Sequence, residues 1–307
     1  MLRVNAAELV IGAAAGKGEK HHYIPSFYSR EWAGQDGRLC EYSRPFRQVK
    51  PQSKHPDATG YVRGLYTVPG DEPEVAEHIE RNFFRITDNG AAVVAQQLRA
   101  PGPVDFSNMD RSSWSRFIIS LMLRNPEYVN KMAAEVVSFY AQTDNEEQYQ
   151  KLRSPDDPPT FEEYVARRIF HPAGRMSAYA LQKIIDSPTM GGHLNKMRWS
   201  VMTFARERHT LLTSDRPIIM TNGIIGKDDH LALPIGPRKL FITTNNIEAE
   251  NMIRAIDAGI IMRQINDRVA SQARKYVYGD DDSQVRFVEN RLGRKWPSTP
   301  LESRFPA

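Results

Sequence analysis

Cysteine is almost absent from this sequence, and its absence excludes several kinds of protein. Cys40 is the only cysteine among 307 residues, so no disulfide can form within the chain and no cysteine cluster can hold a metal ion. A lone thiol is typical of a reducing compartment, and we expect a cytoplasmic protein. Residues 39–42 around it predict a short strand, in which Cys40 serves as a small apolar filler.

Long apolar runs and internal repeats are also missing. No apolar run approaches 18 residues, so we expect no membrane-spanning helix and no membrane partner. The apolar stretch at residues 6–16 is short and is interrupted by Glu8, which argues against a secretion signal. No period of 20 to 50 residues recurs, and solenoids and propellers are thereby set aside.

Two well-known catalytic motifs are incomplete. Residues 12–17 resemble a phosphate-binding loop, but three residues rather than four separate the glycines and Gly18 replaces the metal-binding Ser or Thr. His209 and Ser214 suggest a serine hydrolase, yet the chain has no Gly-x-Ser-x-Gly elbow. Neither motif therefore supports a reaction.

The chain carries a mild excess of positive charge. The formal net charge is +4, and residues 1–70 hold ten Lys and Arg against six Asp and Glu. Aromatic residues interleave these charges, among them Tyr23, Phe27, Tyr28, Trp32, Tyr42, Phe46 and Tyr61. Such a pattern is found where proteins contact phosphates and stack on bases, and it is also found on ordinary solvated surfaces.

The first part of the chain predicts a small β element after a short helix. Pro25 can begin a helix over residues 25–33, with Tyr28 and Trp32 on one face. Strands are expected at residues 39–42, 47–49 and 61–68 because β-favouring side chains lie there between Gly, Pro and Asp turns.

The rest of the chain predicts helices, then strands, then helices. Apolar residues at spacings of three and four indicate helices over residues 73–98, 110–140 with a break at Pro126, and 161–185. Alternating patterns then predict strands at residues 199–204, 209–213, 218–221, 231–235 and 240–244. Asn246 is expected to cap a closing helical pair over residues 247–258 and 260–276.

This order predicts an α+β fold. It has a small N-terminal β element, central helices, and a C-terminal antiparallel or mixed sheet with closing helices. We expect residues 1–19 to form a flexible extension, residues 20–292 a single α+β domain, and residues 293–307 a flexible tail.

Several short motifs together resemble the family catalogued as domain of unknown function 4238. Its opening element, His-x-Ile/Val-Pro-x-Phe-Tyr, stands at residues 22–28, and its Ser-Asp-x-Pro signature stands at residues 214–217. An Arg-x-Pro turn at residues 124–126 and an Ile-Asn helix at residues 265–266 also match. The resemblance runs from about residue 20 to 278 and implies one structural unit of unassigned activity.

Three residues in these motifs are the candidate site residues. His22 could be a general base or metal ligand, or it could cap the short helix. Asp215 is either a catalytic carboxylate at a strand end or an ordinary turn residue. Arg124 could hold an anionic substrate or pair with a structural carboxylate. We predict that the three meet around one concave region.

These candidates favour hydrolysis of a phosphodiester or another phosphorylated substrate, with an anionic small molecule or nucleic acid as partner. A divalent metal ion could assist, although no residue is assigned to it. The His-x-Ile-Pro start also resembles that of the ββα-metal nucleases, but no helix follows the predicted strands before His55, and the next asparagine is Asn82. The alternative is a module that binds nucleic acid or an acidic partner without catalysis.

Overall fold

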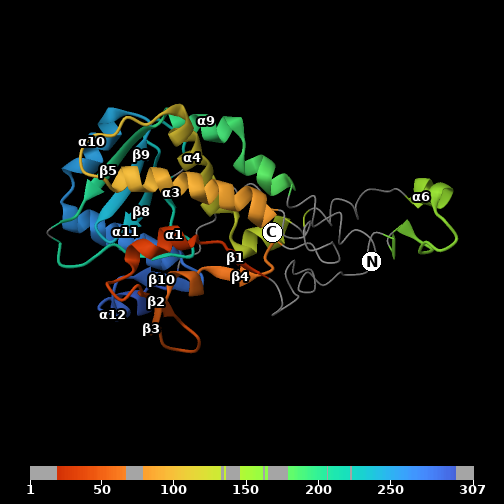
Figure 1. Cartoon of the computed structure of the whole chain (residues 1–307), viewed down its shortest axis with the longest axis horizontal. Helices are drawn as coiled ribbons and strands as arrows, with labels where there is room; N and C mark the ends of the chain where they lie inside the picture. Colours follow the sequence, from red (N-terminus) through yellow and green to blue (C-terminus); the bar gives the residue numbers. More distant parts are fainter. Residues whose placement is uncertain are drawn as a thin grey trace. The chain divides into compact units, whose positions relative to one another are not determined.

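The computed structural model describes residues 19–66, 79–132, 135, 146–161, 163–164, 179–205, 207–221 and 223–294 (Figure 1). Within them, antiparallel sheets combine with helices that follow and precede them in the chain, which confirms the predicted α+β fold. The predicted N-terminal extension and C-terminal tail lie almost entirely outside the described residues.

The first sheet joins strands that are far apart in the sequence. Its order is β3-β2-β10-β6, and every neighbouring pair is antiparallel. Strand β10 lies between the N-terminal hairpin and β6, so the beginning and the end of the folded chain share one sheet. The strands are β2 (Leu39–Ser43), β3 (Lys50–Lys54), β6 (Thr213–Ser214) and β10 (Tyr276–Gly279).

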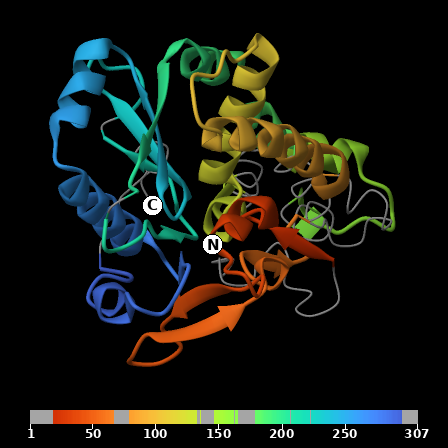
Figure 2. The same cartoon turned by 60° about the vertical axis from the view of Figure 1, so that its left-hand side comes forward.

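The second sheet is antiparallel and has the order β5-β9-β8-β7, in which β7, β8 and β9 form a meander and β5 pairs with β9. The strong alternation of its residues made these strands predictable, and four of the five strands predicted between residues 199 and 244 are confirmed in this sheet. Helices α10 and α11 lie along one side of it (Figure 2). Its strands are β5 (Arg198–Thr203), β7 (Ile219–Met220), β8 (His230–Gly236) and β9 (Lys239–Thr244).

The side chains of β9 alternate between two apolar layers. Leu240 and Ile242 join a core with Ile261 and Met262 of α11, whereas the Phe241 ring lies 5.6 Å from that of Trp114 in α4. All of these side chains are less than 5% exposed. Helices therefore cover the second sheet on both faces, and the apolar area that they bury stabilises this part of the fold.

Helices and short strands complete the described chain. Asn246 caps α10 as predicted, because its side chain accepts a hydrogen bond from the Ala249 N–H at 2.7 Å. These elements are β1 (Lys20–His22), α1 (Ser26–Ser29), η1 (Arg30–Trp32), η2 (Pro56–Ala58), β4 (Tyr61–Arg63), η3 (Ile79–Phe84), α3 (Arg85–Arg99), α4 (Asn108–Leu123), α6 (Glu146–Leu152), α9 (Pro188–Lys196), α10 (Ile247–Ala255), α11 (Ala258–Gln272) and α12 (Val285–Glu289).

The predicted opening helix is present as α1 followed by η1. Tyr28 and Trp32 point into the core as expected, with 1% and 0% of their surfaces exposed. The Trp32 indole N–H donates to the Leu211 carbonyl at 2.7 Å. The Tyr28 hydroxyl donates to the Pro234 carbonyl and shares a hydrogen bond with Thr213 Oγ1, each at 2.7 Å. These bonds satisfy the polar ends of two buried rings.

The strands predicted at residues 209–213 and 61–68 are mostly wrong, since the described residues there form strand only at Thr213–Ser214 and Tyr61–Arg63. Two further sequence-based predictions of elements are wrong. The last helix ends at Gln272 rather than at Tyr276, because residues 276–279 pair with β2 and β6 instead. The second strand of the N-terminal hairpin covers residues 50–54 rather than 47–49, which belong to the connecting loop. In both places, pairing with a partner strand overrides the local pattern.

Contacts along the chain group it into two compact units. Unit 1 comprises residues 1–21, 62–86 and 123–186, and unit 2 comprises residues 22–61, 87–122 and 187–307. Such a grouping does not decide whether the units unfold together, so the single domain over residues 20–292 stays a prediction. It is tested by whether calorimetric unfolding gives one cooperative transition.

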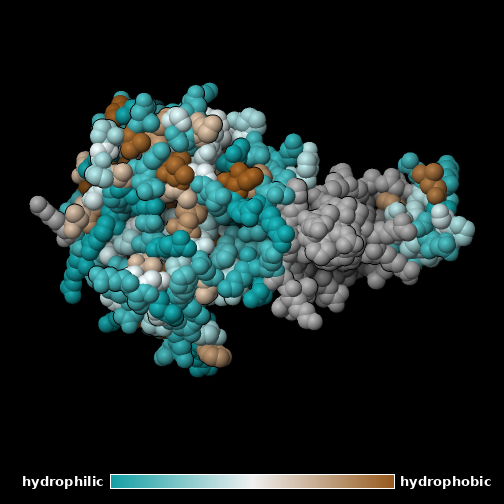
Figure 3. Space-filling view, in the orientation of Figure 1, coloured by the Kyte–Doolittle hydropathy of each residue, from teal (hydrophilic) through white to brown (hydrophobic). Residues whose placement is uncertain are grey.

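The face of the described chain seen in Figure 3 is mostly hydrophilic, with hydrophobic residues over α3 and α10. Single apolar residues of this kind are common on protein surfaces and need no partner. In the part of the chain that the structure describes, no helix is both long and apolar enough to cross a bilayer.

Candidate functional site

The three predicted site residues have clear positions. His22 ends β1, where its ring lies 5.7 Å from the ring of Tyr61. Asp215 follows β6 directly and is 6% exposed. Arg124 follows α4 and is fully buried, with its guanidinium 5.5 Å from the Phe84 ring. His22 and Asp215 belong to unit 2 and Arg124 to unit 1, so the meeting of all three stays a prediction.

Asp215 holds the connection between α11 and β10. One carboxylate oxygen accepts the Arg274 N–H at 3.0 Å, and the other accepts those of Lys275 and Tyr276 at 2.6 and 3.1 Å. Its own N–H donates to the Tyr276 carbonyl at 3.0 Å. Ser214, the preceding residue, accepts the Arg216 N–H. The Ser-Asp-x-Pro signature thereby ties two distant segments together, which is a structural use of the carboxylate.

Glu41 lies in the middle of the first sheet. It pairs with Tyr278 across β2 and β10 and is 6% exposed. The Thr59 hydroxyl donates to its Oε2. Burial raises the pKa of Glu41, and the Thr59 hydroxyl and Lys54 act in the opposite direction. Burial is also the largest cause of the raised pKa of Tyr278, and Glu41 adds to it.

Tyr276 extends the same polar face toward the edge of the sheet. Burial raises its pKa first, and nearby Glu41, Asp215 and Tyr61 raise it further. His22 borders these side chains through Tyr61, and Asp215 borders them through Tyr276. We call this set the tyrosine–carboxylate cluster; its members are Glu41, Thr59, Tyr61, Asp215, Tyr276 and Tyr278.

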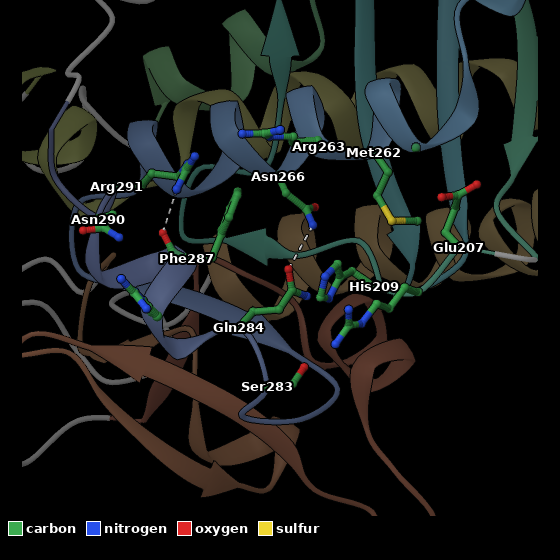
Figure 4. A pocket seen from close by; sticks show the side chains of 13 residues that line it. Glu207, His209, Met262, Arg263, Asn266, Ser283, Gln284, Phe287, Asn290 and Arg291 are labelled. Carbon is green, nitrogen blue, oxygen red and sulfur yellow. Dashed lines mark hydrogen bonds between the residues drawn. The ribbon is translucent and has the colours of Figure 1, made fainter.

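A separate cavity of about 560 Å³ lies beside α11 in unit 2 (Figure 4). Glu207 and His209 face it from the loop before β6, Asn266 from α11, and Gln284 and Phe287 from the segment around α12. Four arginines also line it, and we call it the arginine pocket: Arg208, Arg263, Arg286 and Arg291.

A hydrogen-bonded amide network fixes the three segments of the arginine pocket. Asn266 Oδ1 accepts the Leu212 N–H at 2.8 Å, and its amide group donates to the Thr210 carbonyl at 2.8 Å and to Gln284 Oε1 at 3.3 Å. Gln284 in turn donates to the Thr210 carbonyl at 3.1 Å. Asn266 and Gln284 are 3% and 6% exposed, so these bonds replace water and hold the walls in place.

The arginines of the pocket differ in how they are used. Arg291 donates to Asp267 Oδ1 at 2.7 Å, and its guanidinium lies 3.7 Å from the Phe287 ring centroid. Arg208, Arg263 and Arg286 are exposed, and within the described residues they form neither an ion pair nor a side-chain hydrogen bond. These three carry guanidinium groups that are available to an anion.

This pocket was not predicted from the sequence, although two of its residues were already singled out. Asn266 belongs to the Ile-Asn helix motif, and His209 was considered only for a serine hydrolase triad. The arginines come from three separate segments, and each has an ordinary surface context in the sequence. Only the packing of α11 against the segment around α12 brings them together.

A metal centre receives no support from the side chains that the structure describes. In these ranges no three or more His, Cys, Asp or Glu residues gather closely enough to hold an ion. The sequence-based suggestion of a divalent metal ion therefore has no assigned ligands.

Comparison with known proteins identifies a family and nothing more specific. Searches of the curated proteins and of the solved structures gave no match. One family model, described as protein of unknown function (DUF4238), matches residues 20–283. That range contains the opening His-x-Ile-Pro element, the Ser-Asp-x-Pro signature and most of the arginine pocket. The match covers more than half of the chain, and the chain therefore belongs to this family.

Proposed function

We propose that this protein binds a phosphorylated ligand in the arginine pocket and hydrolyses its phosphoester bond. The observation that carries the proposal is the presence of Arg208, Arg263 and Arg286 around one cavity, without ion pairs within the described chain. Guanidinium groups bind phosphate oxygens through paired N–H donors, more tightly than neutral donors do.

The size and charge of the pocket support this ligand class. Its volume of about 560 Å³ falls within the range of small-molecule sites. Four arginines and one glutamate, Glu207, line it, which is a formal surplus of three positive charges. Asp267 neutralises Arg291 from outside the lining, so about two charges remain for the ligand. A phosphate group carries a comparable negative charge at neutral pH.

His209 is the group that we assign to proton transfer. It is exposed to the cavity, and histidine is the side chain that most often serves as a general acid or base in catalysis. In the proposed step, a water oxygen attacks phosphorus, His209 takes the proton of that water, and the bond between phosphorus and the leaving oxygen breaks. The arginines stabilise the negative charge on the phosphoryl oxygens.

This assignment moves the base of the predicted hydrolase from His22 to His209. Asp215 already accepts three backbone N–H groups, which supports a structural role for it. Neither His22 nor Asp215 lines the arginine pocket. Catalysis by His22 and Asp215, with Arg124 on the substrate, remains the alternative assignment.

The first experiment measures binding alone. Titration calorimetry with inorganic phosphate and with a nucleoside monophosphate compares the native protein with Arg263→Gln, Arg286→Gln and the double variant. We expect each substitution to raise Kd about tenfold, equivalent to about 1.4 kcal/mol, as for the loss of one charge-assisted contact. Arg85→Gln removes an exposed arginine of α3 and serves as the control, whose Kd should be unchanged. Equal affinity in all variants would refute the pocket.

The second experiment tests hydrolysis. Release of nitrophenol from mono- and bis-nitrophenyl phosphate is followed with Mg²⁺ and with a chelator, since a metal ion could assist. His209→Ala should lower kcat by roughly a hundredfold or more while leaving ligand affinity nearly unchanged. The same loss in His22→Ala, with full activity in His209→Ala, would return the base to His22. Ligand binding without turnover would contradict hydrolysis and would show that the pocket only binds its ligand.

A further inference from the structure

A strongly basic β-hairpin stands apart from the arginine pocket. It consists of β2, β3 and the loop of residues 44–49, with Ser43 paired to Lys50 and Leu39 paired to Lys54. Strand β3 is at the edge of the first sheet, and the loop projects beyond its neighbours (Figures 1 and 2). The side chains of residues 50–53 are all exposed. One side of this hairpin is therefore open along its length.

The positive charge of the hairpin is concentrated and not neutralised. Residues 38–54 contain five basic residues and one acidic residue, a surplus of four that equals the formal net charge of the whole chain. The acidic residue is Glu41, which is buried and bonded to Thr59. Within the described residues, Arg47 and Lys50 are exposed and form no ion pair. The basic residues are Arg38, Arg44, Arg47, Lys50 and Lys54.

An exposed aromatic ring stands among these charges. Phe46 is 83% exposed, more than any other exposed large apolar residue in the described chain. It lies in the loop between Arg44 and Arg47. The exposed Phe46 ring leaves apolar surface in contact with water. A flat partner that covers the ring would remove this surface from water, which is favourable.

The hairpin is held firmly by the rest of its unit. Arg44 donates to the Glu289 carbonyl at 2.5 Å, and the Tyr42 hydroxyl donates to the Asp281 carbonyl at 2.5 Å. Arg38 bridges the two strands through hydrogen bonds to Ser53 at 2.9 and 2.8 Å. The exposed charges therefore extend from an anchored frame, which lowers the entropy lost when a partner binds.

We propose that this hairpin binds single-stranded nucleic acid, with Arg47 and Lys50 on phosphates and Phe46 stacked on a base. Lysine and arginine contacts to phosphates supply sequence-independent affinity, and aromatic rings stack on bases that are free of a duplex. An acidic protein would satisfy the charges, but a single-stranded nucleic acid also carries a base that can stack on Phe46 beside every phosphate. The proposal is independent of hydrolysis in the arginine pocket.

The basic residues of β3 have a simpler alternative explanation. Edge strands often carry lysine and proline, which prevent pairing with other chains and aggregation, and Lys50 and Pro51 lie on such a strand. That explanation requires neither the exposed Phe46 nor the arginines of the loop. The two explanations differ in what the loop residues do to binding, and this difference can be measured.

The test uses fluorescence anisotropy of the full chain with labelled oligothymidylate and oligouridylate of about 12 nucleotides, a length within usual site sizes. We expect saturable binding with a Kd of about 1–100 μM, the range of non-specific binding. Phe46→Ala and the double variant Arg47→Gln, Lys50→Gln should each weaken it at least about fivefold. The double variant should also lower the slope of log K against log salt by about 1.4, for two lost phosphate contacts on a single strand.

Matched controls remove the same groups elsewhere. Ile225→Ala removes an apolar side chain that is 77% exposed, and the double variant Arg85→Gln, Lys227→Gln removes two exposed positive charges. Neither should change Kd by more than about twofold. All of these positions are exposed, and a common melting temperature checks that the variants remain folded.

Three results would overturn the proposal. The first is no saturable binding up to about 100 μM, the second is equal losses in the hairpin and control variants, and the third is tighter binding to duplex DNA or to polyglutamate than to either single strand. Preference for thymidylate or uridylate would identify DNA or RNA as the partner. Phosphate binding to the arginine pocket is measured separately and should be unchanged in the hairpin variants.

Discussion

The tyrosine–carboxylate cluster and the arginine pocket lie in the same unit, but their charged groups differ in whether they have bonding partners. In the cluster, Glu41 accepts from Thr59 and Asp215 accepts three backbone N–H groups. In the pocket, Arg263 and Arg286 have no partner within the described chain. A buried charge without partners is costly, whereas an exposed guanidinium is solvated. The carboxylates therefore serve the fold, and the arginines are available to a ligand.

This contrast predicts that stability and ligand binding depend on different residues. Substitutions in the cluster should lower the free energy of unfolding, and substitutions in the pocket should lower affinity. The predictions that follow test this separation, beginning with the largest expected change in stability.

Asp215→Ala should cause the largest loss. Removing the carboxylate leaves the N–H groups of residues 274–276 without their acceptor. We expect a loss of about 3–5 kcal/mol in the free energy of unfolding, because a buried N–H group without an acceptor costs about 1–3 kcal/mol. Asp215→Asn keeps one acceptor oxygen and should lose less, about 1–3 kcal/mol. Urea unfolding monitored by circular dichroism measures both. An unchanged unfolding midpoint with lost hydrolysis would instead support the catalytic role predicted from the sequence.

The case of Asp215 shows what the sequence could and could not predict. Its place at a strand end followed from the local alternation and from Pro217. Its partners did not, because residues 274–276 were predicted as helix. Strand β10 forms by pairing with β6 and with β2, and β2 lies more than 200 residues earlier in the chain. Local patterns carry no information about such a distant partner.

The candidate sites show the same limit. The burial of Trp32 and the capping by Asn246 were predictable, since each depends on neighbouring residues. The arginine pocket was not, because Arg208, Arg263 and Arg286 meet only after α11 packs beside α12. The basic character of the first 70 residues was visible in the sequence, but its concentration on one open hairpin required the register of β2 and β3.

Glu41→Gln should change how stability depends on pH. Burial raises the pKa of Glu41 in the folded protein, so the folded state binds more protons than the unfolded state above the unfolded pKa, near pH 4.3. As the pH rises from the unfolded pKa to the folded pKa, Glu41 therefore lowers the free energy of unfolding. Above the folded pKa this decrease is complete. Glutamine does not titrate and can still accept from Thr59.

We therefore expect the difference in unfolding free energy, variant minus native, to become more favourable to Glu41→Gln between pH 4 and pH 8, by about 1 kcal/mol or more. Urea midpoints measured at several pH values give this difference. Gln96→Glu, on the exposed face of α3 and outside the tyrosine–carboxylate cluster, adds a carboxylate at the surface and should show no comparable trend. If the unfolding free energies of Glu41→Gln and the native protein change with pH in the same way, the pKa of Glu41 is not raised in the folded protein.

The smallest effects are expected in the arginine pocket. Arg263→Gln and Arg286→Gln should change the free energy of unfolding by less than about 0.5 kcal/mol, because exposed side chains without partners add little to stability. Arg291→Gln is the internal comparison: it breaks the contact with Asp267 and uncovers the Phe287 ring, and it should lose about 0.5–1 kcal/mol. Urea unfolding without phosphate ranks the three variants.

With saturating phosphate, the native protein should gain stability by ligand binding, and Arg263→Gln should gain less. A larger loss in Arg263→Gln than in Arg291→Gln without ligand would mean that the fold, and not a ligand, uses the arginine of α11.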